Sequence, residues 1–254
     1  MKIAGKVAVV TGGASGIGLG SCREFVARGG RVVLFDVQEE RAKEAVRELG
    51  EEHAHFVTVD VSDADQVERG MRSALERFGA VHAVLNAAGV PHAAKIVADD
   101  GTPFPSELWS RTLAVNLTGT FHVTRFAAAA MLKNAPDEEG ERGVIVNVSS
   151  GAAWQGQMGQ AAYSATKAGV IGMVLPAARD LAKHGIRVLA IAPGLIDTGM
   201  LAGLPEKALA GLAKLPLFPK RLGRPREVGA LFCSIVEIPY LNATCLSLDA
   251  GARM

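Results

Sequence analysis

Two side chains spaced four residues apart could carry out acid–base chemistry. Tyr163 and Lys167 bound the segment Tyr-Ser-Ala-Thr-Lys, and this spacing places both on one face of a helix. A tyrosine phenol has a pKa of about 10, too high for proton transfer at neutral pH, and a neighbouring ammonium lowers it by favouring the phenolate. Alone, such a pair is more typical of an exposed helix surface, so its meaning depends on other residues.

Two further polar residues could complete a site around this pair. Ser150 ends the segment Asn-Val-Ser-Ser, 13 residues before Tyr163, and a hydroxyl there could bind a substrate carbonyl beside the phenol. Asn116 lies in a long predicted helix and could order a water near Lys167. A turn or cap is the plainer interpretation of the serine, and a solvated helix position that of the asparagine. The joint presence of all four residues favours a catalytic site.

A glycine-rich turn near the start of the chain could bind a dinucleotide. Gly12, Gly16 and Gly18 lie between a predicted strand and a predicted helix. The first glycine permits a tight turn, the second lets the backbone approach a phosphate, and the third lets the helix pack near the strand. Free N–H groups at the helix N-terminus would then face a pyrophosphate. The spacing is not the GxGxxG of the longer dehydrogenases, and three glycines alone are a weak signal.

An acidic residue at the end of the next strand indicates which dinucleotide. Asp36 follows Gly18 by 18 residues, and a carboxylate there can accept hydrogen bonds from both adenosine ribose hydroxyls. It would repel a 2′-phosphate, and no Lys or Arg stands at positions 13, 14 or 37 to attract one. The sequence therefore predicts NAD rather than NADP, with a strand-end turn residue as the alternative for Asp36. Asp60 and Val61, at the end of the third strand, suit an adenine.

These residues follow predicted strands, as expected of an open parallel sheet that binds ligands at the carboxyl ends of its strands. Short apolar runs predict strands near 7–10, 31–35, 56–59, 81–85, 144–148, 186–191 and 244–248, with helical patterns near 17–29, 39–49, 63–78, 106–134, 160–184 and 225–236. Continuously apolar strands indicate burial on both faces. We predict a single α/β domain over residues 1–254, a Rossmann-type doubly wound sheet of about seven parallel strands with helices on both faces. Asp63 is a predicted helix N-cap, with Gln66 as in a capping box.

Several segments depart from this alternation. Residues 91–105 and 134–142 look like insertions. The stretch 194–223 is rich in Leu, Gly and Pro, keeps a short helical run at 206–213, and suits a mobile lid over an apolar ligand. An ordinary surface connection fits its composition equally well. The basic residues within 220–226 could meet the phosphates of coenzyme A, although a solvated loop is the simpler interpretation.

Composition excludes several other classes of protein. The chain has 254 residues, a formal net charge of +1 and 49% hydrophobic residues, so it is not expected to be disordered or to bind nucleic acid or an anionic membrane. No apolar run approaches the roughly 18 residues of a membrane span. Three cysteines without CxxC spacing favour a reducing, cytoplasmic location, and six histidines without ligand spacing predict no metal site.

Together, these motifs resemble those of the short-chain dehydrogenase/reductase family over the whole chain. The matching residues are Thr11 to Gly18, Asp60, Asn86-Ala87-Ala88-Gly89, Asn116, Ser150, Tyr163, Lys167 and Pro193-Gly194. The resemblance implies that Tyr163 is the acid/base, that Ser150 polarises the carbonyl or alkoxide, and that Lys167 binds the nicotinamide ribose and lowers the tyrosine pKa. Asn116 would hold a proton-relay water. The implied cofactor contacts are Gly12, Ser15, Gly16, Ile17, Gly18, Asp36, Asp60, Val61, Asn86, Ala88, Gly89, Tyr163, Lys167, Pro193, Gly194, Leu195, Ile196 and Thr198.

The second half resembles one subgroup of this family, the type 2 short-chain 3-hydroxyacyl-CoA dehydrogenases, also described as type 10 17β-hydroxysteroid dehydrogenases. The likeness lies in segments 142–145, 156–164, 192–195, 204–207, 221–223 and 248–254. It implies NAD-dependent oxidation of (S)-3-hydroxyacyl-CoA to 3-oxoacyl-CoA. An NAD-linked hydroxysteroid or other secondary-alcohol dehydrogenase, an NADPH-linked 3-oxoacyl-carrier-protein reductase and a non-catalytic scaffold stay open as alternatives.

Two further features bear on assembly and on the lid. The catalytic helix carries many small residues, and family members commonly associate as homotetramers through such helices; close packing inside the subunit is the alternative. The chain ends in Asp249-Ala250-Gly251 where the family usually has Asp-Gly-Gly, and Gly199 follows Thr198. Both departures leave the lid contacts open, and with them the preferred acyl chain length.

Overall fold

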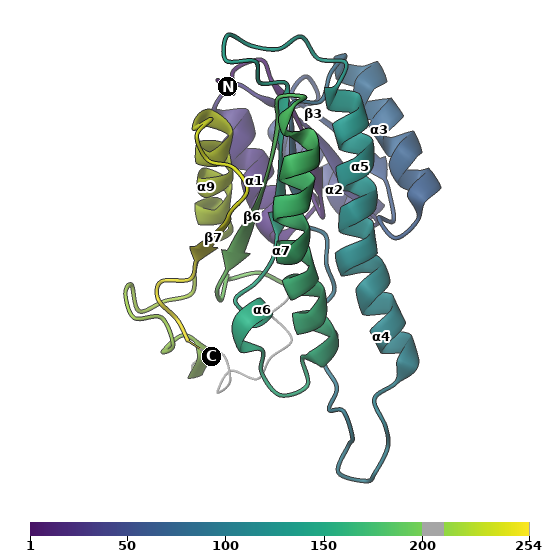
Figure 1. Cartoon of the computed structure of the whole chain (residues 1–254), viewed down its shortest axis with the longest axis vertical. Helices are drawn as coiled ribbons and strands as arrows, with labels where there is room; N and C mark the ends of the chain where they lie inside the picture. Colours follow the sequence, from purple (N-terminus) through teal and green to yellow (C-terminus); the bar gives the residue numbers. More distant parts are fainter. Residues whose placement is uncertain (200–210, 254) are drawn as a thin grey trace.

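The sheet lies at the centre of the molecule, between two layers of helices (Figure 1). In this computed structural model, residues 1–199 and 211–253 are described. Its strands are β1 (Val7–Thr11), β2 (Arg31–Asp36), β3 (Ala54–Thr58), β4 (Ala83–Asn86), β5 (Gly143–Val148), β6 (Ile186–Pro193) and β7 (Cys245–Leu248). They form one 7-stranded sheet in the order β3-β2-β1-β4-β5-β6-β7, and every neighbouring pair is parallel. The predicted Rossmann-type sheet is confirmed.

The helices largely follow the predicted pattern, with one addition. They are α1 (Gly16–Ala27), α2 (Glu39–Leu49), α3 (Ala64–Phe78), α4 (Ser106–Leu113), the π-helical turn η1 (Ala114–Gly119), α5 (Thr120–Met131), α6 (Ala152–Gln155), α7 (Ala161–Ala182) and α9 (Pro225–Glu237). The helix predicted over 106–134 is found as one continuous helical run over 106–131, in which η1 is a π-helical turn between α4 and α5. Helix α6 had no counterpart in the prediction. The predicted helical run at 206–213 falls mainly on residues 200–210, outside the described residues.

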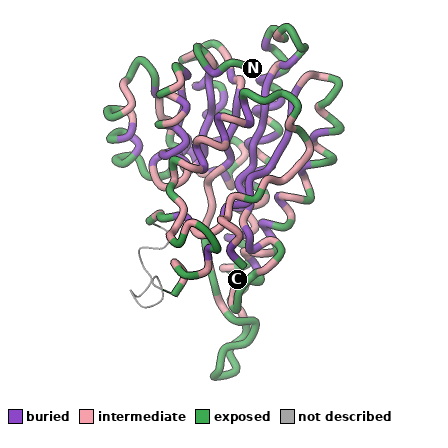
Figure 2. The backbone as a smooth tube through the Cα atoms, turned by 90° about the vertical axis from the view of Figure 1, so that its left-hand side faces the viewer, coloured by how far each residue is buried: buried purple, intermediate pink, exposed green. Residues whose placement is uncertain are grey.

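Apolar side chains cover both faces of the sheet, as the unbroken apolar strands predicted. On one face Val10 and Leu34 pack with side chains of α1, α2 and α9, where the rings of Phe25 and Phe232 stack at 5.8 Å between centroids. On the other face Val9 packs with side chains of α3, α5 and α7. Figure 2 shows the strands as the buried centre of the fold. This rigid sheet fixes the positions of the loops at its carboxyl edge.

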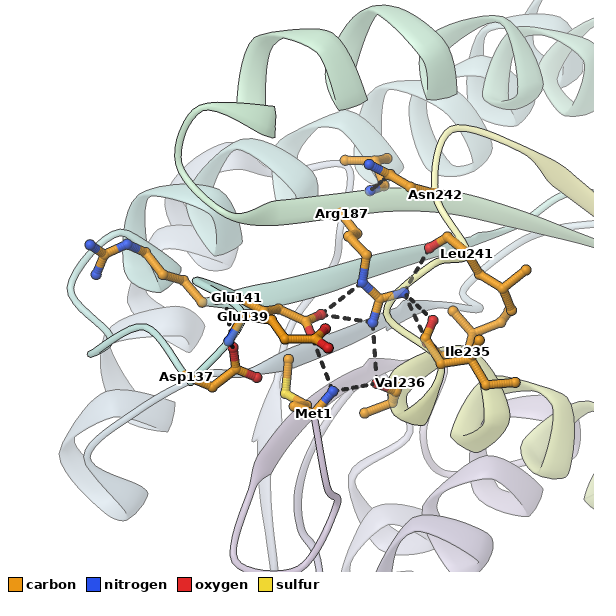
Figure 3. A network of polar contacts seen from close by, with 12 residues as sticks. Met1, Asp137, Glu139, Glu141, Arg187, Ile235, Val236, Leu241 and Asn242 are labelled. Carbon is orange, nitrogen blue, oxygen red and sulfur yellow. Dashed lines mark hydrogen bonds and ion pairs between the residues drawn. The ribbon is translucent and has the colours of Figure 1, made fainter.

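A buried ion pair joins the amino edge of the sheet to the end of α9 (Figure 3). The Arg187 guanidinium, on β6, lies 2.7 Å from Glu141, and both side chains are less than one-tenth exposed. The amino group of Met1 also lies 2.9 Å from Glu141. Arg187 further donates, over 2.8 to 3.3 Å, to the carbonyls of Ile235, Val236, Ile238 and Leu241. The carbonyls of Ile235 and Val236 lie in the last turn of α9, where helix carbonyls have no N–H partner within the helix, so Arg187 satisfies this C-terminus.

The predicted N-cap of α3 is confirmed, with a difference in its partner. Asp63 Oδ1 accepts hydrogen bonds from the N–H groups of Asp65 and Gln66. The Gln66 side chain donates to Asp63 Oδ2 and accepts from the N–H of Asp60 at 3.0 Å, rather than from the N-cap backbone. The cap therefore also holds the end of β3, where the adenine-binding residues were predicted.

Two of the unusual segments can be located. Residues 91–105 form a hairpin that projects from the carboxyl edge of the sheet, with Val97 bridging Pro103 (Figure 2). The two ends of the predicted lid, 194–223, lie side by side, because Ile196 pairs with Gly223 and the Asp197 N–H donates to the Gly223 carbonyl at 2.8 Å. In the described part of the chain we find no helix with the length and apolar character needed to cross a membrane.

Candidate active site

The glycine turn between β1 and α1 has room only for a bare backbone. Gly12 and Gly16 have φ angles of +63° and +49°, which favour glycine. A Cβ on Gly12 would lie 3.1 Å from the Ala88 backbone, and one on Gly18 would overlap the Gly12 carbonyl oxygen. The Ala88 N–H donates to Thr11 Oγ1 at 3.0 Å, which ties this turn to the loop after β4. The turn thus forms a cradle at the point where the strand order reverses, as a dinucleotide pyrophosphate requires.

Asp36 is fixed against this turn. Its Oδ2 accepts from the Ala14 N–H at 3.0 Å, and its Oδ1 accepts from the Gln38 N–H at 2.9 Å. The residue is only 6% exposed. Each carboxylate oxygen can accept two hydrogen bonds and accepts one of these here, so both keep capacity for a further donor such as a hydroxyl.

A cavity of about 370 Å³ opens beside Ala14, Ser15 and Gly16, and Arg41 of α2 lines it. Arg41 is not among positions 13, 14 and 37, the only ones at which the sequence prediction considered a basic residue that could attract a 2′-phosphate. The sequence feature that could have identified Arg41 is its position in the first turn of α2, the helix that follows Asp36. Ile17, in the first turn of α1, packs against the core beneath the turn.

The end of β3 presents an ionised carboxylate. Asp60 Oδ1 accepts from the Ser62 N–H and hydroxyl at 2.9 and 2.6 Å, and Oδ2 lies 3.4 Å from the Arg111 guanidinium. Partial burial raises the pKa of Asp60, but the Ser62 hydrogen bonds and the Arg111 charge outweigh it and bring the pKa below its usual value. Asp60 can therefore accept hydrogen bonds at neutral pH.

The loop after β4 reaches the site with its main chain rather than with the side chain of Asn86. That side chain is 3% exposed and donates to Asn147 Oδ1 at 2.8 Å and Thr124 Oγ1 at 3.4 Å, so it joins β4 to β5 and α5. Ala88 and Gly89 then border the glycine turn and the catalytic residues. Any contact from Asn86 to a cofactor would have to come from its backbone.

Ser150 and Tyr163 are brought together as the sequence predicts. The Ser150 hydroxyl, in the loop after β5, hydrogen-bonds the phenol of Tyr163 on α7. Burial raises the pKa of Tyr163, and the hydrogen bond with Ser150 acts in the opposite direction. The phenol therefore carries its proton at neutral pH in this structure.

Lys167 lies beside the phenol ring, and its ammonium is hydrogen-bonded to the end of β5. Its ammonium is 5.6 Å from the ring centroid of Tyr163 and donates to the Val148 carbonyl at 2.8 Å. Burial lowers the pKa of Lys167 to about 8. The expected lowering of the phenol pKa by Lys167 is thus not seen in this structure, because the lysine charge is directed at the end of β5.

Asn116 completes the cluster from η1. Its Oδ1 accepts from the Val90 N–H at 2.8 Å, and its Nδ2 donates to the Val90 carbonyl at 3.0 Å and to Thr166 Oγ1 at 3.3 Å. A Cβ on Gly89 would lie 3.2 Å from Asn116 Oδ1 and 3.6 Å from Lys167 Nζ. Glycine at position 89 therefore lets Asn116 and Lys167 approach the same loop.

The segment after β6 closes the opposite side of the cradle. The Gly151 N–H donates to the Pro193 carbonyl at 3.1 Å, and a Cβ on Gly194 would lie 2.9 Å from Asp249. The backbone then passes through Leu195 and Ile196, and a Cβ on Gly16 would meet the Thr198 side chain at 3.3 Å. Thr198 thus lies directly against Gly16 of the glycine turn.

In residues 1–199 and 211–253, no group of three or more His, Cys, Asp or Glu side chains is arranged to hold a metal ion. Two of the histidines bind other groups: His82 accepts from the Val7 N–H, and His92 lies 3.2 Å from Thr112 Oγ1. Burial, with nearby Lys6 and Arg31, lowers the pKa of His82 to about 4. It therefore stays neutral at physiological pH.

Known proteins resemble this chain over its whole length. A family model described as short chain dehydrogenase matches residues 6–209. The 3-hydroxyacyl-CoA dehydrogenase type-2 of Homo sapiens is 44% identical over 254 residues, covering 100% of this chain and 97% of that protein. A 3-oxoacyl-[acyl-carrier-protein] reductase of Thermotoga maritima is 35% identical, covering 99% of each. The crystal structure of 3-hydroxyacyl-CoA dehydrogenase type-2 from Mycobacterium avium matches with a TM-score of 0.93 and 37% identity, over 100% of this chain and 98% of the other.

Proposed function

Because the chain belongs to the short-chain dehydrogenase family, and so is an oxidoreductase acting on a hydroxyl group, we propose that it is an NAD-dependent 3-hydroxyacyl-CoA dehydrogenase. It would oxidise (S)-3-hydroxyacyl-CoA to 3-oxoacyl-CoA. The carrying observation is that Ser150, Tyr163, Lys167 and Asn116 meet at the carboxyl edge of the sheet beside the glycine cradle. Full-length identity to relatives of that name supports the substrate class.

The proton chemistry is assigned to the chain's own residues. In oxidation, the Tyr163 oxygen would take the proton of the substrate hydroxyl while Ser150 hydrogen-bonds the same oxygen. Lys167 is mainly charged at pH 7, because its pKa is about 8, and its ammonium would have to turn from the Val148 carbonyl toward the phenol oxygen to stabilise a phenolate. Asn116 would order the water through which Tyr163 exchanges its proton. The cradle residues would hold a nicotinamide dinucleotide, which would supply the acceptor for the hydride of the substrate carbon.

We assign the cofactor contacts to the groups that line this cradle. The glycine turn would bind the pyrophosphate, and Asp36 the adenosine ribose. Asp60 and Val61 would meet the adenine. The nicotinamide end would lie near the catalytic pair and the lid base; its proposed contacts are Ala88, Gly89, Tyr163, Lys167, Pro193, Gly194, Leu195, Ile196 and Thr198.

The choice of NAD over NADP rests on Asp36. Its carboxylate is buried and fixed at the glycine turn, so it would repel a 2′-phosphate, whereas Arg41 is exposed at the adjoining cavity. Asp36→Ala should therefore narrow the ratio of kcat/KM for NADH over NADPH at least tenfold, since a charge repulsion worth about 1.4 kcal/mol or more is removed. Adding Arg41→Ala to the Asp36→Ala variant should lower kcat/KM for NADPH again. An unchanged ratio in Asp36→Ala would reject its role.

Substrate comparison separates the remaining candidates. With NAD, (S)-3-hydroxybutyryl-CoA should be oxidised much faster than its (R) enantiomer and than a 17β-hydroxysteroid. Faster steroid oxidation would favour the hydroxysteroid dehydrogenase, and a preference for acyl-carrier-protein thioesters with NADPH would favour the reductase. A chain that binds NADH but turns over none of these would fit a scaffold.

We also propose a homotetramer that uses α7, and a cytoplasmic location supported by the unpaired cysteines. Small and apolar residues form an exposed stripe along this helix: Ala161, Ala165, Ala168, Gly172 and Leu175. Ala162 is buried, and a Cβ on Gly169 would lie 3.0 Å from Leu117, so those two pack inside the subunit. Ala165→Arg should shift the sedimentation profile to smaller species; an unchanged tetramer would reject this face.

A further inference from the structure

One continuous helical run contacts both ends of the proposed cofactor site. The run comprises α4, η1 and α5 (Figure 1). Asn116, in its centre, binds the loop next to Lys167. Five to six residues to either side, Arg111 and His122 contact the loop at Asp60 and Val61. The loop at Asp60 and Val61, where the adenine is proposed to bind, is therefore held by the same helical run that carries Asn116 of the proposed catalytic cluster.

His122 holds the backbone of this loop. Its Nδ1 lies 3.2 Å from the Val61 carbonyl oxygen. Because a carbonyl oxygen only accepts hydrogen bonds, Nδ1 must carry the proton in this contact. The ring thereby donates to a peptide group whose neighbours, Asp60 and Ser62, are bonded to each other.

Gly119 sets how closely this loop approaches the helix. A Cβ on Gly119 would lie 2.6 Å from Val61 Cγ2 and 3.1 Å from the Val61 carbonyl carbon. Val61 is 6% exposed, so its side chain has little free space to retreat into. A side chain at position 119 would push the loop outward.

The contacts fix the loop on every side. The Asp60 N–H donates to Gln66, the Asp60 carboxylate is bonded to Ser62 and Arg111, and the Val61 carbonyl accepts from His122. Such contacts leave the outward edge of the loop presented in one conformation. A ligand then binds without ordering the loop first, which raises its affinity.

We propose that His122 and Gly119 are positioning residues for the adenine end of the cofactor. This inference rests on the proposed function, which places the adenine at Asp60 and Val61. Neither residue contacts the reacting atoms. Their loss should therefore weaken adenosine binding and leave the nicotinamide end unchanged.

The test uses the free protein and adenosine 5′-monophosphate, whose binding is measured by titration calorimetry. His122→Leu removes the donor and keeps a side chain of similar bulk, and should raise the dissociation constant about fivefold to tenfold, as expected for a lost hydrogen bond. His122→Asn is the matched control. Its amide nitrogen sits at the same distance along the side chain as Nδ1, so it should restore binding to within about twofold of the wild type.

Two further readouts separate positioning from general damage. Gly119→Ala should weaken the binding of adenosine 5′-monophosphate in the same way. It provides an independent test of the proposal in the event that His122→Leu folds poorly. Reduced nicotinamide mononucleotide lacks the adenosine, so its dissociation constant should be the same for each variant as for the wild type. Its fluorescence reports this binding. The positioning role would be overturned if adenosine 5′-monophosphate bound equally well to the wild type, His122→Leu and Gly119→Ala. It would also be overturned if these two variants lost affinity for both ligands in parallel. Failure of the wild type to bind adenosine 5′-monophosphate would instead overturn the proposed adenine site itself, and with it this inference.

Discussion

Replacing Lys167 by methionine should stabilise the nucleotide-free fold while it abolishes turnover. Lys167 is 5% exposed, and burial lowers its pKa from 10.5 to about 8. Each pKa unit corresponds to about 1.4 kcal/mol, so a charged lysine here costs the folded protein about 3 kcal/mol at neutral pH. Methionine fills similar space without a charge.

One contact opposes this gain. Lys167 Nζ donates to the Val148 carbonyl at 2.8 Å, and a buried carbonyl that loses its donor costs about 1–3 kcal/mol. The net stabilisation at pH 7 is therefore about 1 kcal/mol. As the pH rises from 8 toward 10.5, the folded protein has already released the proton while the unfolded chain still holds it, so the wild type becomes more stable. Methionine does not titrate, so the stability of the variant lacks this rise with pH. Near pH 10 the variant should therefore be less stable than the wild type.

Urea unfolding followed by tryptophan fluorescence measures both effects. The titrations are run at pH 7, 8, 9 and 10 at one protein concentration. Lys183→Met is the control, because Lys183 is exposed at the end of the same helix and its replacement should change the free energy of unfolding by less than about 0.5 kcal/mol. A destabilised Lys167→Met at pH 7, or a difference from the wild type that does not vary between pH 7 and 10, would refute the reasoning.

Four other substitutions test three separate parts of the account. Tyr163→Phe should fold and bind NADH but lose at least about 100-fold in kcat, as steady-state kinetics would show, because the proton donor is gone; a largely retained rate would exclude the phenol. Ala250→Gly should raise the free energy of unfolding by about 0.5–1 kcal/mol in urea titrations, since Ala250 has a φ of +52°; Gly251→Ala, at +71°, should lower it. Arg187→Met should lower the same quantity by about 3 kcal/mol, because the carbonyls at the end of α9 lose their donor and Glu141 keeps only the Met1 amino group as a charged partner; a loss below 1 kcal/mol would contradict this.

The strands and most helices could be predicted because single runs of residues specify them. Unbroken apolar runs such as Val7–Val10 place strands to within about two residues of their observed ends. The role of Gly18 was also readable, since only glycine lets a helix start so close to a strand. The departure at Ala250 has a physical meaning in the structure, where that residue takes a left-handed conformation that favours glycine.

The π turn within the long helix could not be predicted. A π turn such as η1 accommodates an extra residue in the helix, and the residue types around Asn116 give no sign of it, so the hydrophobic periodicity predicts an ordinary α-helix there. Helix α6 spans four residues, too few to show a helical period. The Arg187 network joins an insertion, a strand and the end of α9, and only tertiary folding brings these together.

Side-chain directions within the site were the other limit. The sequence places Lys167 on the same helix face as Tyr163, yet its ammonium binds Val148 on a strand that the spacing does not specify. Likewise, Asn86 belongs to the motif after β4, but its side chain turns to Asn147 and Thr124. Arg41 reaches the cavity beside the glycine turn only through the packing of α2. Such directions depend on neighbours far apart in the sequence.

The most direct test of the central claim is the rate of acetoacetyl-CoA reduction at neutral pH, with NADH and NADPH at equal concentrations in parallel cuvettes. Absorbance of the reduced nicotinamide reports turnover. The account predicts rapid oxidation of NADH and a rate at least tenfold lower with NADPH, because Asp36 stands where the 2′-phosphate would lie. No turnover with either cofactor would contradict the assigned substrate, and equal rates would contradict the assignment of NAD.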